Sequence, residues 1–173
     1  VTFDDVTVNY SDLMERVHRL AVGFFKEGIK KGTHTVIILD NCMEYILSYF
    51  ALFYIGAVPV PINTRWNPAE AVKVIKDSGA SYFIAREHSG KLCFSQLRDI
   101  LENDGVTINR VILCDPDESG RSDFDKIAVD DTDTELEPLS GSDIAMISYT
   151  SGTTGTPKGV MLRHSDIAKI SLY

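Results

Sequence analysis

The residues with the clearest chemical potential lie in one short stretch of the 173-residue chain. It reads Tyr-Thr-Ser-Gly-Thr-Thr-Gly-Thr-Pro-Lys-Gly and spans residues 149–159. Its glycines let the backbone turn amide groups toward one point, and its hydroxyl side chains add hydrogen-bond donors. Clustered amides, hydroxyls and one ammonium group form a cradle for phosphate oxygens. A flexible polar surface loop is the alternative, but the position between two apolar segments, with Lys158 at the end of the loop, favours phosphate binding.

Two common phosphate-binding motifs do not fit this stretch. The P-loop of NTPases needs Gly-x-x-x-x-Gly-Lys-[Ser/Thr], whereas here Pro157 precedes Lys158 and Gly159 follows it. The dinucleotide-binding pattern Gly-x-Gly-x-x-Gly is also absent. The stretch instead resembles the signature of the adenylate-forming superfamily, which includes acyl-CoA synthetases, firefly luciferase and the adenylation domains of peptide synthetases. That signature reads approximately aromatic-Thr-Ser-Gly-[Ser/Thr]-Thr-Gly-x-Pro-Lys-Gly, and every fixed position is matched.

The resemblance extends over most of the chain. Residues 10–13 are similar to the family's early Tyr-x-x-Leu helix start, and residues 56–65 to its Gly-Ala-Val-x-Val-Pro-x-Asn-x-Arg segment. Residues 143–145 lead into the signature, and His164 follows it, as in the family. A departure is residues 32–34, Gly-Thr-His, where many relatives have Gly-Asp. The Pro-Val-Pro-Ile-Asn form favours acyl-CoA synthetases over peptide-synthetase domains.

What the resemblance implies is a two-step reaction. A carboxylate, fatty or aromatic, attacks the α-phosphorus of ATP to give acyl-AMP and pyrophosphate, and the thiol of coenzyme A then displaces AMP. ATP, Mg²⁺ and coenzyme A are the implied cofactors. Lys158 is the implied catalytic residue, because its ammonium would offset charge on the β- and γ-phosphates. The implied ATP-binding residues are Thr150, Ser151, Gly152, Thr153, Thr154, Gly155, Lys158 and Gly159.

The family's adenine-binding strand, ribose-binding Asp, acyl pocket and C-terminal lid domain have no counterpart in this sequence. We therefore expect a piece of a longer enzyme, similar to its first third and inactive alone. Two alternatives stay open at this point. One is an amino-acid-activating adenylation domain of a peptide synthetase, and the other is a non-catalytic nucleotide-binding module.

The elements that must position the signature alternate between helix and strand. Apolar, β-branched runs at residues 35–39, 82–85 and 110–114 are typical of strands buried on both faces. Four helices are expected beside them. The first is capped by Ser11 and ended by Gly28, and the second covers 43–55. The third begins with a capping box of Asn67 and Glu70 and runs to Ser78, and the fourth covers 91–103. The alternation predicts an α/β fold, a layered sheet with flanking helices. The predicted plan is a layered subdomain over 1–127, an acidic connector over 128–142 and a strand-loop-strand unit over 143–173, in which Ser165 caps a last helix.

Composition narrows the class of protein. The formal net charge is −8, and residues 115–143 hold eleven acidic residues against Arg121 and Lys126. An acidic balance argues against nucleic-acid partners. No apolar run is long enough for a membrane span, and three separated cysteines indicate reduced thiols in a cytoplasmic protein. No metal site is predicted, because Lys126 stands where a calcium loop beginning at Asp115 needs its glutamate, and no His has a partner at ligand spacing.

Overall fold

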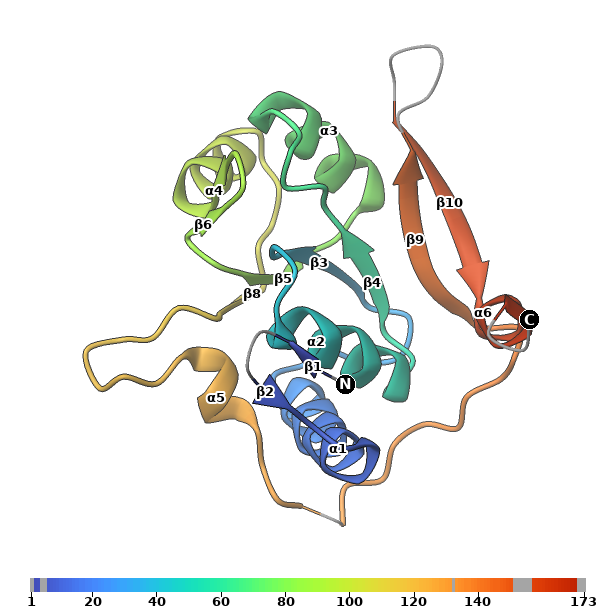
Figure 1. Cartoon of the computed structure of the whole chain (residues 1–173). Coiled ribbons are helices and arrows are strands. Elements are labelled where there is room, and N and C mark those ends of the chain that lie inside the picture. The colour runs from blue at the N-terminus through green and yellow to red at the C-terminus, as the bar shows by residue number, and fades with distance from the viewer. Residues whose placement is uncertain (1, 4–5, 132, 151–156, 171–173) are drawn as a thin grey trace.

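A four-stranded parallel sheet forms the centre of the computed structural model, which describes residues 2–3, 6–131, 133–150 and 157–170. Its strands lie in the order β4 (Val58–Pro61), β3 (His34–Ile38), β5 (Tyr82–Ala85) and β8 (Arg110–Leu113) (Figure 1). Every neighbouring pair is parallel. The predicted α/β fold with flanking helices is confirmed.

Helices cover both faces of this sheet. α1 (Tyr10–Lys26) and α2 (Met43–Tyr54) pack on the face that presents Ile37 of β3. α3 (Pro68–Ser78) and α4 (Phe94–Asn103) pack on the face that presents Val36 and Ile38. Since successive strand residues point to opposite faces, an unbroken apolar run supplies both cores, as the sequence predicts.

The helix ends follow local signals, with one correction. Asn67 and Glu70 form the predicted capping box of α3, which stops at Gly79 with φ 62°. The cap of α1 was expected at Ser11, and that is wrong. Asn9 takes the extended cap conformation, and its Oδ1 accepts a hydrogen bond from the backbone N–H of Asp12 at 2.9 Å. Ser11 already lies inside the first turn.

The segment before α4 also differs from expectation. The helix predicted from residue 91 begins at Phe94, because β6 (His88–Ser89) and β7 (Leu92–Cys93) form a small antiparallel hairpin first. Gly90 makes its turn with φ 55°, and a Cβ there would lie 2.5 Å from the carbonyl oxygen of Thr64. Only glycine fits this turn.

Three short elements have no counterpart in the sequence predictions. α5 (Asp123–Ile127) begins with a capping box between Ser122 and Asp125 and packs Phe124 against the α1 face. β1 (Thr2–Phe3) pairs antiparallel with β2 (Val6–Thr7). Five or fewer residues give too short a periodicity to stand out from the sequence.

The acidic segment that follows α5 runs along the surface. Residues 128–131 and 133–140 contain no helix or strand. Ion pairs join this segment and Asp143 to α1 and the turn after it: Arg19 with Asp130 at 2.7 Å, Lys26 with Asp131 at 2.5 Å, and Lys31 with Asp143 at 2.8 Å. The boundaries proposed for a connector over 128–142 stay a prediction.

An antiparallel hairpin of β9 (Ile144–Thr150) and β10 (Lys158–Arg163) lies beside β4, and α6 (His164–Ile170) follows it (Figure 1). Ala145 and Ile147 of β9 are buried, and Ile147 joins the core under α3 and α4. The last helix starts at His164, so Ser165 lies in its first turn rather than at its cap. Among the described residues, no helix combines the length and the apolar character that crossing a membrane requires.

Candidate phosphate-binding site

The pairing of β9 with β10 places the two ends of the candidate loop side by side. Thr150, the last residue of β9, lies directly opposite Lys158, the first residue of β10. Both side chains are exposed. Ser151, Gly152, Thr153, Thr154 and Gly155 lie outside the described residues, so their contacts with phosphate stay predictions.

The register also sets which face carries the polar groups. Directly opposite residues share one face of a hairpin, with Cβ atoms about 4.5–5.5 Å apart. The hydroxyl of Thr150 and the ammonium of Lys158 therefore rise from the same face, a donor and a cation at the mouth of the loop. Such a pair can donate hydrogen bonds to the phosphate oxygens of one ligand.

The other face of the hairpin end is packed against the helix layer. Tyr149 lies opposite Gly159, and its phenol donates a hydrogen bond to Asp77 Oδ2 of α3 at 2.6 Å. Burial raises the pKa of the Tyr149 phenol well above its usual range, and the hydrogen bond to Asp77 acts in the same direction. The phenol is thus a neutral donor throughout the physiological range.

Gly159 leaves room for this aromatic ring. A Cβ at residue 159 would lie 3.0 Å from Tyr149 Cζ and 3.0 Å from Ile147 Cγ2, closer than ordinary van der Waals contact. The sequence suggested Gly159 as a phosphate contact. The geometry gives it a packing role, and the phosphate contact stays a prediction.

A small cavity of about 130 Å³ lies at the root of the loop. It is lined by residues of α3 and by residues on both sides of the loop: Lys73, Val74, Asp77, Tyr149 and Pro157. Pockets for small-molecule ligands usually measure roughly 300–1,000 Å³. The cavity is smaller than this range and lies where α3 meets the hairpin.

Asp77 is the site residue that sequence reasoning missed. It lies 72 residues before Tyr149 and carries no motif of its own. The helical spacing of α3 places it among polar positions, but nothing in the sequence says that it faces the hairpin. Only the packing of β9 beside β4 brings the two together.

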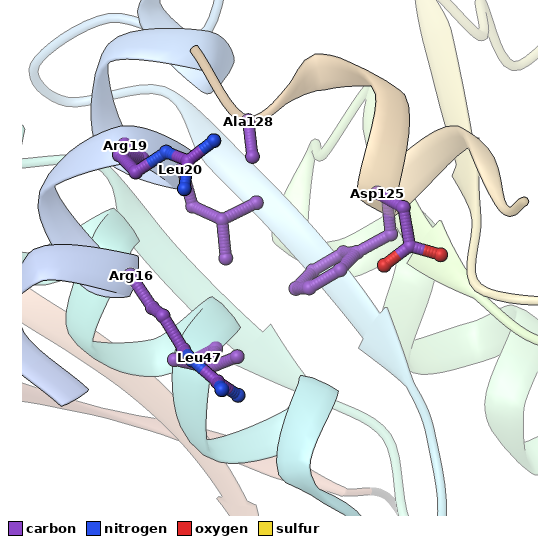
Figure 2. Close-up of a pocket in the computed structure, with 7 residues that line it drawn as sticks. Arg16, Arg19, Leu20, Leu47, Asp125 and Ala128 are labelled. Carbon is purple, nitrogen blue, oxygen red and sulfur yellow. The ribbon is translucent and has the colours of Figure 1, made fainter. Parts of the chain in front are cut away.

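A second cavity, shown in Figure 2, lies between α1, α2 and α5 and has a volume of about 250 Å³. Its lining residues are Arg16, Arg19, Leu20, Leu47, Phe124, Asp125 and Ala128. Arg19 is paired with Asp130, and Asp125 accepts hydrogen bonds in the capping box of α5. The cavity contains no residue of the signature, so it does not form part of the candidate site.

Among the described residues, no three His, Cys, Asp or Glu side chains lie close enough together to hold a metal ion. In the acidic loop rejected above as a calcium site, Asp117 contacts the ammonium of Lys126 at 2.5 Å. A side chain of the protein itself thus supplies the positive charge there.

Comparison with known proteins shows the family. The sequence model of the AMP-binding enzymes matches residues 1–172. The chain belongs to the AMP-binding enzyme family. It is 36% identical over 169 residues to the crotonobetaine/carnitine–CoA ligase of Proteus mirabilis, covering 95% of this chain and 32% of that protein. The chain thus spans about a third of the length of the curated relatives it matches.

Solved structures give the same family. A long-chain-fatty-acid–CoA ligase from Archaeoglobus fulgidus superposes with a TM-score of 0.81 at 27% identity, covering 99% of this chain and 33% of that chain. The N-terminal subdomain of a Klebsiella oxytoca protein, NpsA, in complex with 3-hydroxybenzoyl-AMSN, superposes with a TM-score of 0.75 at 25% identity, covering 97% and 37%. The resemblance proposed from the signature is confirmed.

Proposed function

We propose that the full-length protein carrying this chain is an AMP-forming acid–CoA ligase. The observation that carries the proposal is the pairing of Thr150 with Lys158 at the two ends of a complete adenylate-forming signature. Membership of the AMP-binding enzymes and the names of the relatives, which are CoA ligases, support it.

The first step would be adenylation of a carboxylic acid. A carboxylate oxygen attacks the α-phosphorus of ATP, the bond from that phosphorus to the bridging oxygen breaks, and pyrophosphate leaves. Negative charge builds on the leaving group and on the oxygens around phosphorus, so donors fixed beforehand stabilise the transition state. Lys158 supplies a cation toward the β- and γ-phosphates, and the hydroxyl of Thr150 donates a hydrogen bond to a phosphate oxygen. Mg²⁺ enters as part of the substrate MgATP, since this ion is commonly held by substrate phosphates and few protein groups.

The second step would transfer the acyl group to coenzyme A. The thiolate of coenzyme A attacks the acyl carbonyl carbon, and AMP leaves as the thioester forms. We assign no residue of this chain to that step. The proposed contribution of the chain is to hold the phosphates during the first step.

The proposal names a class of carboxylic acid and not one compound. The relatives' names cite carnitine or crotonobetaine, a long-chain fatty acid and a 3-hydroxybenzoyl group. We propose a small organic, fatty or aromatic carboxylic acid as the substrate. A cytoplasmic location fits the free thiols of Cys42, Cys93 and Cys114.

The test is acid-dependent exchange of labelled pyrophosphate into ATP by the full-length protein. The panel contains carnitine, crotonobetaine, fatty acids of several lengths, hydroxybenzoates and the amino acids. We expect exchange with at least one non-amino acid, followed by thioester formation when coenzyme A is added. Exchange with amino acids alone would indicate a peptide-synthetase adenylation domain, and no exchange with any acid would contradict the proposal.

A further inference from the structure

One side-chain hydrogen bond ties the end of the hairpin to the helix layer of the sheet. Tyr149 of β9 donates to Asp77 in the last turn of α3 at 2.6 Å. Among the described residues it is the only hydrogen bond that joins either strand of the hairpin to the four-stranded sheet or its helices. The remaining attachment is apolar and goes chiefly through Ile147.

The bond acts next to the proposed phosphate contacts. Tyr149 and Thr150 are adjacent, and successive strand residues point to opposite faces. Fixing the phenol of Tyr149 on α3 therefore fixes the direction in which the Thr150 hydroxyl rises, and the register extends this to Lys158.

The local packing supports this arrangement. The phenol oxygen of Tyr149 would lie 3.2 Å from a Cβ at residue 159, so the ring lies over Gly159 on its way to Asp77. Pro157 and Lys73 line the small cavity beside the same ring. The absence of a side chain at Gly159 is thus what lets the phenol reach the carboxylate.

From this geometry we infer that Asp77 and Tyr149 form a positioning pair, which orients the Thr150 and Lys158 face of the hairpin for binding the phosphates of ATP. The inference rests on the proposed function and adds to it two residues that do not themselves touch the substrate. Asp77 acts through Tyr149, and Tyr149 acts through the hairpin.

The experiment uses the full-length protein and three changes: Tyr149→Phe, Asp77→Ala and the two combined. Each single change removes the hydrogen bond, so we expect kcat/KM for ATP to fall about tenfold in each, a typical effect of one charge-assisted hydrogen bond. The double variant should fall no further than the singles, because both changes remove the same interaction. Asp77→Asn keeps an acceptor oxygen and should recover most of the loss.

Matched controls separate positioning from general stability. Tyr82→Phe removes another partly buried phenol, and Asp104→Asn removes a carboxylate that pairs with Lys76 of α3. Both should leave kcat/KM for ATP unchanged, and KM for the acid should be unchanged in all variants. Additive losses in the double variant, or losses of the same size in the controls, would overturn the inference.

Amide hydrogen exchange gives a readout that needs no activity. In Tyr149→Phe and Asp77→Ala, the amides of Thr150 and Lys158 should exchange faster than in the wild type, while the amide of Ala145 should not change. Unchanged exchange at Thr150 and Lys158 would overturn the inference even in an active enzyme. A wild type that exchanges no pyrophosphate with any acid contradicts the proposed function instead, and amide exchange still decides on the positioning pair.

Discussion

Lys158 lies directly opposite Thr150 across the β9–β10 hairpin. The pairing of two strands, rather than the loop between them, brings the cation and the hydroxyl together on one face. On the opposite face, the phenol of Tyr149 donates a hydrogen bond to Asp77 of α3, and its ring lies over Gly159. Among the described residues, the hairpin end therefore has one face attached to α3 and one face with exposed side chains.

Replacing Lys158 with Ala in the full-length protein should reduce the rate of adenylation. Loss of one fixed charge contact in a transition state typically costs about 100- to 1,000-fold in kcat. Lys158 is exposed and has no partner side chain among the described residues, so the melting temperature should not change. Steady-state pyrophosphate release with a saturating acid is the measurement.

Two further variants control this result. Lys158→Arg keeps the charge but changes the donor geometry, and it should recover part of the lost rate. Lys169→Ala removes an exposed lysine of α6 away from the loop and should have no effect. If the Lys158→Ala enzyme released pyrophosphate at the wild-type rate, Lys158 would be a surface residue with no role in adenylation.

Gly23 offers a test of how α1 meets α5. A Cβ at this position would lie 2.0 Å from the carbonyl oxygen of Ile127. Alanine is favoured over glycine inside a helix by about 1 kcal/mol, but overpacking a buried contact typically costs about 1–3 kcal/mol. We expect Gly23→Ala to lower the free energy of unfolding, measured by urea denaturation. Gly141→Ala, with its nearest contact at 3.4 Å, is the matched control, and a Gly23→Ala protein as stable as the wild type would show that α5 is not held against α1.

The acidic segment should respond to pH through Asp131. A hydrogen bond from the Lys26 ammonium lowers the pKa of this carboxyl to about 2, and the backbone N–H of Asp133 adds to the effect. Because the folded pKa is below the value of about 3.9 for a free Asp, the contact contributes fully above about pH 4 and is lost as the pH falls toward 2. Lys26→Met should raise the pKa of Asp131 toward its ordinary value. Carboxyl carbon NMR at about pH 4 would test this, since Asp131 stays ionised in the wild type and is more protonated in the variant. An identical titration in both would contradict the contact.

The cysteines should react unequally with alkylating reagents. Burial raises the pKa of Cys42 to about 11, with Glu44 contributing, and burial raises the pKa of Cys114 still further. The thiolate is the reactive form, so Cys42 should alkylate on the order of 100-fold more slowly in the folded chain than in urea at pH 8. Iodoacetamide labelling followed by mass spectrometry gives both rates. Equal rates in the folded and unfolded chain would contradict the burial of these thiols.

The sequence predicts the elements that depend on local chemistry. The apolar run that becomes β3, the capping box of α3 and the signature at 149–159 are all readable within a few residues, and the first two form as predicted. The choice between Asn9 and Ser11 as a cap was not readable, since both side chains can cap a helix and only the path of the entering chain selects one.

The parts of the site that the sequence does not predict depend on tertiary packing. Asp77 meets Tyr149 because β9 lies beside β4, and no local pattern encodes that docking. The helix predicted over 91–103 overlaps the second strand of the β6–β7 hairpin, although Gly90 between Ser89 and Lys91 is a turn signal. Long-range contacts of this kind need the fold before they can be seen.

The transfer of labelled oxygen tests the central claim most directly. The full-length protein is supplied with ATP, coenzyme A and its carboxylic acid labelled with ¹⁸O in both carboxylate oxygens. Attack of a carboxylate oxygen on the α-phosphorus leaves that oxygen on phosphorus when the thiol displaces AMP, so the account predicts one ¹⁸O atom in the AMP produced. Label that appears in inorganic phosphate with ADP as the product, or AMP without label, would contradict an acyl-adenylate intermediate.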